Sequence, residues 1–316
     1  MLRRISLLLL VWIGLPVLAW GQFKEGPSED AKLGEAVTHH WRAGVVVKAA
    51  SGPCRGIVGT LPVPAEWPEQ QVRESDQEIN QWARMKDMVV EGVKLMVVSV
   101  PNLPAGQEAK ALVTFEIVRN SILAPKDTQQ FKLANIDRME RSVRPYLSHS
   151  PLIECRNPKI ISQAKEIVKG QDQAWQRIEA LYDWVRNNVE YKSKLRKPKG
   201  AIVALQEKQG GHEDLASLFI ALCRAVDIPA RTVWVPGFCY PEFYLLDAEG
   251  KGQWYPCQVA GERYFGEIPE NRPILQKGDD FRSPTNARER VRYLPESLTG
   301  KGGKPEVEFV RELMGN

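Results

Sequence analysis

The chain has 316 residues, of which 43% are hydrophobic and 26% charged, and its formal net charge at pH 7 is +4. These values are ordinary for a globular protein of about two domains. Residues 1–21 contain Arg3 and Arg4, and without this segment the formal net charge is +2. Such a small charge does not indicate a nucleic-acid-binding surface. Five cysteines are too few for a disulfide-dense scaffold.

Residues 1–21 predict a cleaved secretory signal. After a positively charged start, an apolar run extends from Ile5 to Leu18 and is broken by Gly14 and Pro16. The run is short for a membrane span. We therefore expect cleavage near Gly21 and a secreted or periplasmic mature chain without a membrane span.

Residues 22–122 predict a β-sandwich, because short segments rich in β-branched residues alternate with turns rich in proline and glycine. We expect strands at 43–49, 57–64, 88–100 and 109–119, the third being a hairpin or two short strands around Gly92. Neighbouring histidines on a strand point in different directions, so the pair at 39 and 40 is not predicted to bind a metal ion.

Residues 123–150 are polar and charged and are predicted to be a connector. A second domain, residues 151–285, then begins with helices expected from Pro158, over 172–189 and over 201–206. Residues 172–189 carry an apolar stripe at helical spacing, which indicates a core-facing helix. Residues 286–316 are predicted to be an extension with a short helix near Val307–Leu313.

The stretch from Gly210 to Val235 organises this second domain. Its apolar side chains recur at helical spacing, and Pro229 cannot continue that helix. The glycines at 210 and 211 allow a sharp turn into it. A buried strand is expected from Arg231 onward. His212 is thereby placed at the N-terminus of the helix.

This stretch resembles the transglutaminase-like superfamily, whose papain-like fold uses a Cys-His-Asp triad. The family pattern is roughly G-x-C-x-D/E-x-A-x-L-F-x-A-L-x-R-A-x-G-I-P-A-R. The segments FCYPEFYL (238–245) and QWYPCQ (253–258) resemble the family motifs H-A-W-x-E-V-Y-L and G-W-x-P-x-D. The resemblance covers about residues 151–282. It implies an α+β chain with a β-sandwich followed by a papain-like core.

The resemblance also identifies the three triad positions, where this sequence has His212, Phe238 and Gln258. Cysteine-based acyl transfer needs a thiolate, a histidine that takes its proton and a residue that orients the imidazole. Phenylalanine cannot exchange a proton, so we expect all three positions to be non-catalytic. The pocket and framework residues that match or align with the family pattern are Asp214, Arg231, Trp234, Tyr240, Glu242 and Trp254.

Cys239 and Cys257 are adjacent to two of the triad positions. Side chains alternate faces along a strand, so both should point away from the pocket if Phe238 and Gln258 face it. Three interpretations stay open: two thiols packed in the core, a cross-strand disulfide, or a relocated nucleophile. Cys223 lies on the apolar stripe and is predicted to be core. No residue pattern predicts a metal ion or cofactor.

The sequence therefore favours an exported transglutaminase-like protein without catalysis that binds or scaffolds a protein, a peptide or a cell-envelope polymer. An alternative is an active amidase, peptidase or protein-glutamine acyl transferase with a rearranged site. A third possibility is a structural envelope protein in which the β domain does the binding.

Overall fold

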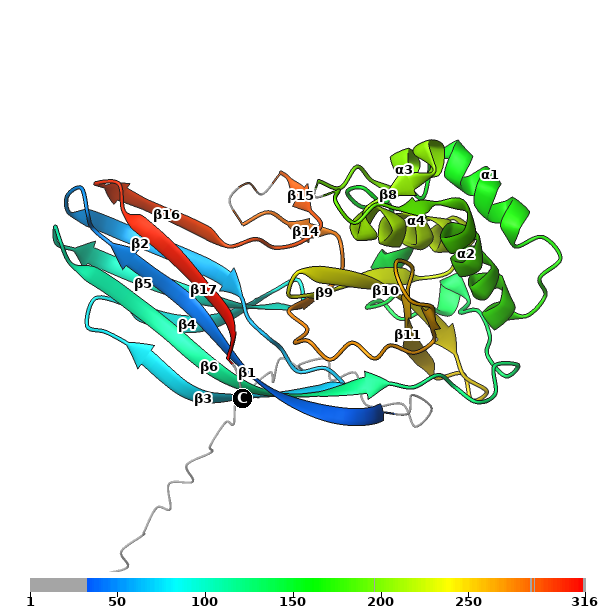
Figure 1. Ribbon diagram of the computed structural model, residues 1–316, viewed down its shortest axis with the longest axis horizontal. Coiled ribbons are helices and arrows are strands. Elements are labelled where there is room, and N and C mark those ends of the chain that lie inside the picture. Colours follow the sequence, from blue (N-terminus) through cyan, green and yellow to red (C-terminus); the bar gives the residue numbers. More distant parts are fainter. Residues whose placement is uncertain (1–32, 196, 285, 287, 315–316) are drawn as a thin grey trace, which may run out of the picture.

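The computed structural model describes residues 33–314 except 196, 285 and 287. It is an α+β chain in which an elongated all-β part lies beside a part that holds the helices (Figure 1). The signal predicted for residues 1–21 lies outside the described residues. Within them, no helix is long and apolar enough to cross a membrane.

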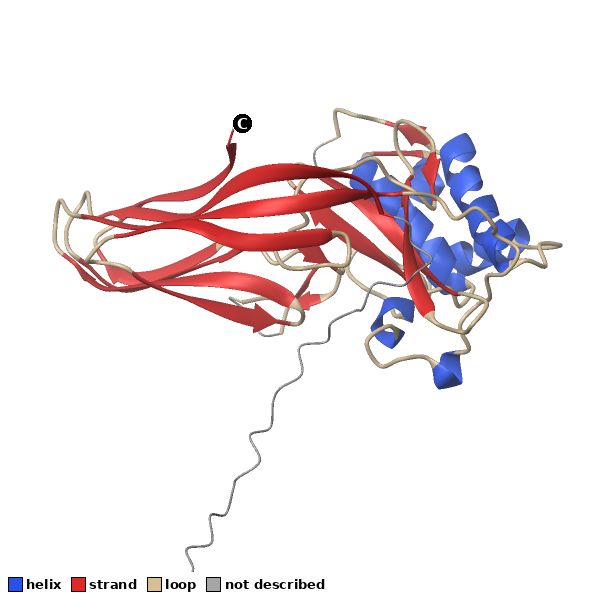
Figure 2. Cartoon of the chain, turned by 90° about the horizontal axis from the view of Figure 1, so that it is seen from below, coloured by secondary structure: helices blue, strands red, loops and turns tan. Residues whose placement is uncertain are grey.

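The all-β part is a sandwich of two four-stranded antiparallel sheets (Figure 2). One sheet has the order β17-β1-β6-β3 and the other β16-β2-β5-β4. The strands are β1 (Leu33–Lys48), β2 (Cys54–Pro62), β3 (Gln70–Ile79), β4 (Arg84–Val90), β5 (Val93–Leu103), β6 (Glu108–Ile122), β16 (Ser297–Gly302) and β17 (Glu306–Met314).

Alternation of buried side chains builds the core of the sandwich. On β1, Trp41, Ala43, Val45 and Val47 point inward and are buried, as expected for a sheet with one face on the core. The predicted hairpin is present as β4 and β5, paired in antiparallel register around a turn at Glu91 and Gly92.

The C-terminal residues do not form the helix expected near Val307–Leu313. They form β17, which pairs along β1, while β16 pairs along β2. Glutamate, arginine and leucine are good helix formers, but the chain instead covers the open hydrogen-bonding edge of β1. Strand β3 was also not predicted, because its side chains are polar and mostly exposed.

The second part is a five-stranded sheet of order β12-β11-β10-β9-β13 with helices packed against it. Its strands are β9 (Ala230–Val235), β10 (Phe238–Leu246), β11 (Gly252–Gln258), β12 (Tyr264–Phe265) and β13 (Gln276–Lys277). The helices are α1 (Pro158–Ile167), α2 (Ala174–Asn188), α3 (Ala201–Glu207) and α4 (His212–Ala225). Short elements are η1 (Ile136–Arg138), η2 (Arg144–Leu147), β7 (Glu190–Tyr191), β8 (Gln209–Gly210), β14 (Phe281–Arg282) and β15 (Arg290–Val291).

Helix α4 is the centre of this part. It packs on β9 and β10, while α1, α2 and α3 pack around it. The apolar stripe predicted for residues 172–189 is buried against the same core, where Trp175 contacts the rings of Phe243, Tyr255 and Phe265. Such edge-to-face aromatic pairs stabilise a core beyond the area they bury.

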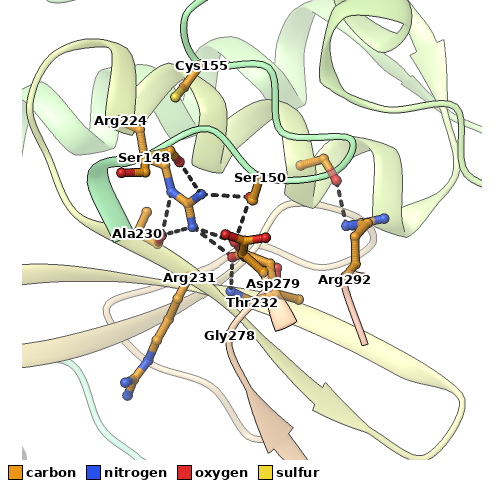
Figure 3. A network of polar contacts seen from close by, with 12 residues as sticks. Ser148, Ser150, Cys155, Arg224, Ala230, Arg231, Thr232, Gly278, Asp279 and Arg292 are labelled. Carbon is orange, nitrogen blue, oxygen red and sulfur yellow. Dashed lines mark hydrogen bonds and ion pairs between the residues drawn. The ribbon is translucent and has the colours of Figure 1, made fainter. Parts of the chain in front are cut away.

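A buried ion pair fastens the C-terminal end of α4 to the sheet (Figure 3). Arg224 Nη2 lies 2.8 Å from each carboxylate oxygen of Asp279, and Arg224 also donates to the carbonyl of Ala230 and to Ser150. Thr232 on β9 donates to the same carboxylate. Removing one partner of such a pair leaves an uncompensated buried charge, so this network holds α4 in a fixed position on the sheet.

Candidate functional site

The start of α4 is built by two glycines and one aspartate. A Cβ atom on Gly210 would lie 2.6 Å from the Cβ of Asp214, so only glycine fits there. The buried Asp214 carboxylate accepts hydrogen bonds from the backbone N–H groups of Gly211, Lys199 and Gly200 at 3.0, 2.6 and 2.9 Å. This anchoring fixes the first turn of the helix and the position of His212.

His212 lies against Phe238, the first residue of β10. Their ring centroids are 5.3 Å apart, and the planes are tilted by 31°. Burial lowers the pKa of His212 below its ordinary value; Arg272 and Arg292 also lower it, and the carboxylates of Glu213 and Asp214 oppose them. The imidazole is therefore held toward its neutral form, beside a ring that has no proton to exchange.

Gln258, at the end of β11, makes its contacts elsewhere. Its backbone carbonyl accepts hydrogen bonds from Tyr182 Oη at 2.9 Å and from Arg186 at 3.1 Å. Its side-chain amide donates to the carbonyl of Glu262 at 3.5 Å. In the part of the chain that the structure describes, no hydrogen bond joins Gln258 to His212. The structure therefore brings together positions 212 and 238 but gives the third position other partners.

Cys239, Cys257 and Cys223 are free thiols packed in the core around α4. The β10–β11 register pairs Glu242 with Pro256, so it does not place Cys239 opposite Cys257, and no disulfide joins them. Burial raises the pKa of all three thiols far above the ordinary value. A buried thiol that stays protonated is neither a good nucleophile nor a good metal ligand.

Trp234 lies beside the start of α4, together with an arginine that sequence analysis did not single out. The guanidinium of Arg292 lies 5.4 Å from the Trp234 ring centre, donates to Glu213 at 3.1 Å and donates to Ser217 at 2.7 Å. The indole N–H donates to the carbonyl of Gly278 at 2.8 Å. These contacts link β9 to the first two turns of α4.

Arg231 and Glu242 form a buried ion pair directly across β9 and β10. Figure 3 shows the Arg231 side chain pointing away from the Arg224–Asp279 pair. Its Nε donates to Glu242 at 2.9 Å, and its guanidinium stacks 4.0 Å from the ring centre of Trp254. Three of the six predicted pocket residues thus meet on the face of the sheet away from the Arg224 network.

Lys277 and Glu69 extend this pair into a chain of buried charges. The Lys277 ammonium donates to Glu242 at 2.9 Å and to Glu69 at 2.7 Å. Burial alone would raise the pKa of Glu69, but the positive charges of Lys277 and Arg119 outweigh it and lower the pKa to about 2. Both carboxylates are therefore surrounded by cations in the interior.

Tyr240 is tied to the sandwich rather than to the start of α4. Its hydroxyl accepts a hydrogen bond of 3.1 Å from Arg119, a fully buried residue near the end of β6. Sequence analysis missed Glu69, Arg119, Lys277 and Arg292. No local pattern marks them, because each acquires its role from a partner far away in the chain.

Among the described residues, no group of three or more histidine, cysteine, aspartate or glutamate side chains is placed to hold a metal ion.

Part of this chain matches a known protein family. Residues 161–259 match the family model described as the transglutaminase-like superfamily. No curated protein matches the chain significantly.

Among solved structures, a candidate cysteine protease from Cytophaga hutchinsonii is 18% identical, with a TM-score of 0.59 over 90% of this chain and 93% of that chain. A candidate protease from Parabacteroides distasonis is 12% identical, with a TM-score of 0.29 over 73% of this chain and 48% of that one. The periplasmic domain of TgpA from Pseudomonas aeruginosa is 13% identical, with a TM-score of 0.32 over 73% and 84%.

The first of these similarities extends over nearly the whole of both chains and shows a shared fold. The family match identifies residues 161–259, which include α4, as a transglutaminase-like domain.

Proposed function

We propose that this protein is an exported transglutaminase-like protein that performs no acyl transfer and acts as a binding or scaffolding module for a protein, a peptide or a cell-envelope polymer. The observation that carries the proposal is the contact between His212 and Phe238, with ring centroids 5.3 Å apart. These residues occupy the positions of the nucleophile and the general base in the family that the chain resembles.

The chemistry of these two side chains supports inactivity. Covalent acyl transfer requires a nucleophile activated by an adjacent base. Phe238 cannot take a proton, and the guanidinium of Arg272, whose charge acts on His212, lies 5.3 Å from the Phe238 ring centre. A cation at that place favours the neutral imidazole but cannot accept a proton from it.

The cysteines do not supply a substitute. Cys239 is 2% exposed, and burial raises the pKa of its thiol. A relocated nucleophile would need an exposed, electropositive position. This argues against a rearranged thiol enzyme, the main alternative function.

Retention of the framework supports a role in binding. The hydrogen bonds of Asp214 and the Arg231–Glu242 pair keep the scaffold rigid around the replaced chemical residues. One scaffold can carry different functional sites, so it can serve recognition as well as catalysis.

The test uses the mature chain from residue 22 with a glutamine-donor peptide and a primary amine. We expect neither isopeptide product nor ammonia, and only slow alkylation of the native protein by iodoacetamide, measured by peptide mapping. Ammonia release that is lost in His212→Ala would overturn the proposal, as would fast selective labelling of Cys239 together with turnover.

A further inference from the structure

A cavity of about 630 Å³ lies on the opposite face of β10 from α4. Its walls come from three places: the ends of β1 and β6 in the sandwich, the connector around residues 132–143, and the β10–β11 hairpin. The volume is typical of ligand pockets, which span roughly 300–1,000 Å³. His212, Phe238 and Gln258 do not line it, so it is separate from the triad positions.

The floor of the cavity is the chain of buried charges. Glu69, Lys277, Glu242 and Arg231 all line it and are 4%, 6%, 1% and 3% exposed. Charged side chains are seldom this buried unless they are paired, and here each is held by a neighbour at 2.7 to 2.9 Å. The floor is therefore polar, preorganised and balanced in charge.

One wall of the cavity is apolar. Met139 and Val143 from the connector pack with Tyr244 of β10, and Trp254 of β11 packs against the same cluster. Backbone hydrogen bonds in both directions between Lys132 and Leu246, each 2.9 Å, attach the connector to the hairpin. This wall is consequently part of the folded structure and can contact an apolar group of a ligand.

The rim has an excess of positive charge. The lining contains five lysine or arginine side chains and three glutamates. Lys132 and Arg138 are exposed and form no ion pair within the described part of the chain. Their charges are therefore available to a ligand, unlike those of the floor.

We propose that this cavity binds short peptides through a carboxylate, with Lys132 and Arg138 at the rim engaging the carboxylate and the Met139–Trp254 wall contacting an apolar side chain. A compact inorganic anion would leave the apolar wall uncovered, and a neutral apolar ligand would leave the rim charges unused. This inference rests on the proposed binding function and specifies its site and ligand class.

The test is calorimetric titration of the chain from residue 22 with an N-acetylated tripeptide that has one leucine and a free C-terminal carboxylate. We expect saturable binding that weakens at least tenfold for the C-terminal amide. The double variant Lys132→Glu/Arg138→Glu should bind the peptide with an affinity at least tenfold lower than the wild type. Absence of saturable binding, or equal binding of acid and amide, would overturn the inference.

A matched control has the same change of charge elsewhere. Arg55 and Lys301 lie opposite each other on β2 and β16, both exposed. Arg55→Glu/Lys301→Glu should bind the peptide within twofold of the wild type. An equal loss in the control variant would mean nonspecific attraction and would overturn the inference, as would competition by equimolar inorganic phosphate.

Hydrogen exchange gives a second readout that does not depend on the variants. The bound peptide should protect residues 132–143 and 250–254 and leave 210–214 unchanged. Protection at 210–214 alone would reject this cavity while leaving the binding function intact. Turnover of a glutamine donor would instead refute the proposed inactivity without affecting the peptide titration.

Discussion

Glu69 and Lys277 are 208 residues apart in the sequence and form a buried ion pair of 2.7 Å. Glu69 immediately precedes β3 of the sandwich, whereas Lys277 lies on β13, at the edge of the transglutaminase-like sheet. Because Lys277 also donates to Glu242, the pair connects the two parts of the molecule through their interiors. Loss of one charge should therefore affect the stability of both parts.

We expect Glu69→Gln to lower the free energy of unfolding at pH 7 by about 3 kcal/mol. The figure follows from the pKa of Glu69, which is about 2 in the folded protein and 4.5 for an ordinary glutamate. A folded-state pKa below the ordinary value contributes stability that is complete above about pH 4.5 and is lost as pH falls toward 2. Urea unfolding across this range should show the difference between wild type and variant shrinking on acidification. Glu78→Gln, at an exposed surface ion pair, should change the stability far less than Glu69→Gln, because water screens that pair. Parallel pH profiles for wild type and Glu69→Gln would contradict this assignment.

The pKa of His212 should lie below 6.5 in an NMR titration, because burial disfavours the imidazolium. Protonation is then harder in the folded state than in the unfolded chain, so this group makes folding less favourable as pH falls below 6.5. Phe238→Ala admits water and should move the pKa back toward the ordinary value. An unchanged pKa in that variant would show that Phe238 does not shield the imidazole.

The double variant His212→Cys/Phe238→His should recreate a reactive thiol. The two positions are already in ring contact, and a thiol at a helix N-terminus beside an imidazole has a lowered pKa. Alkylation by iodoacetamide at pH 7 should be at least tenfold faster than in His212→Cys alone, with a lower pKa in the rate profile. Equal rates in the two variants would mean that the imidazole does not reach the thiol. Gln258 has other partners, so we expect no efficient acyl transfer.

Val310→Asp should destabilise the protein much more than Val307→Asp, because β17 is a strand and the two side chains lie on opposite faces of it. Val310 is 8% exposed and Val307 37% exposed. Burying an unpaired carboxylate should cost about 2–4 kcal/mol at position 310 and less than about 0.5 kcal/mol at position 307. In a helix the two residues would share a face, and their effects would be similar. Thermal or urea unfolding of both variants distinguishes the two structures.

Sequence alone determined the α4-centred part of the fold. Local periodicity predicted helices from Pro158, over 172–189 and after Gly211, and the structure has them at 158–167, 174–188 and 212–225. Motif order predicted strands from Arg231 onward, at 238–245 and at 253–258, which correspond to β9, β10 and β11. The identities of His212 and Phe238 could also be read directly, since the family pattern assigns one position to each. Such features are local in the chain, and local propensity and spacing are sufficient to specify them.

The tertiary structure alone decided where distant segments meet. The helical propensity of residues 307–313 was overridden by the free edge of β1, and the polar β3 became a strand through pairing with β6. The Glu69–Lys277 pair and the cavity above it join segments about 200 residues apart. Burial and pairing partners between such segments arise from the packed chain, so no local pattern in the sequence encodes them.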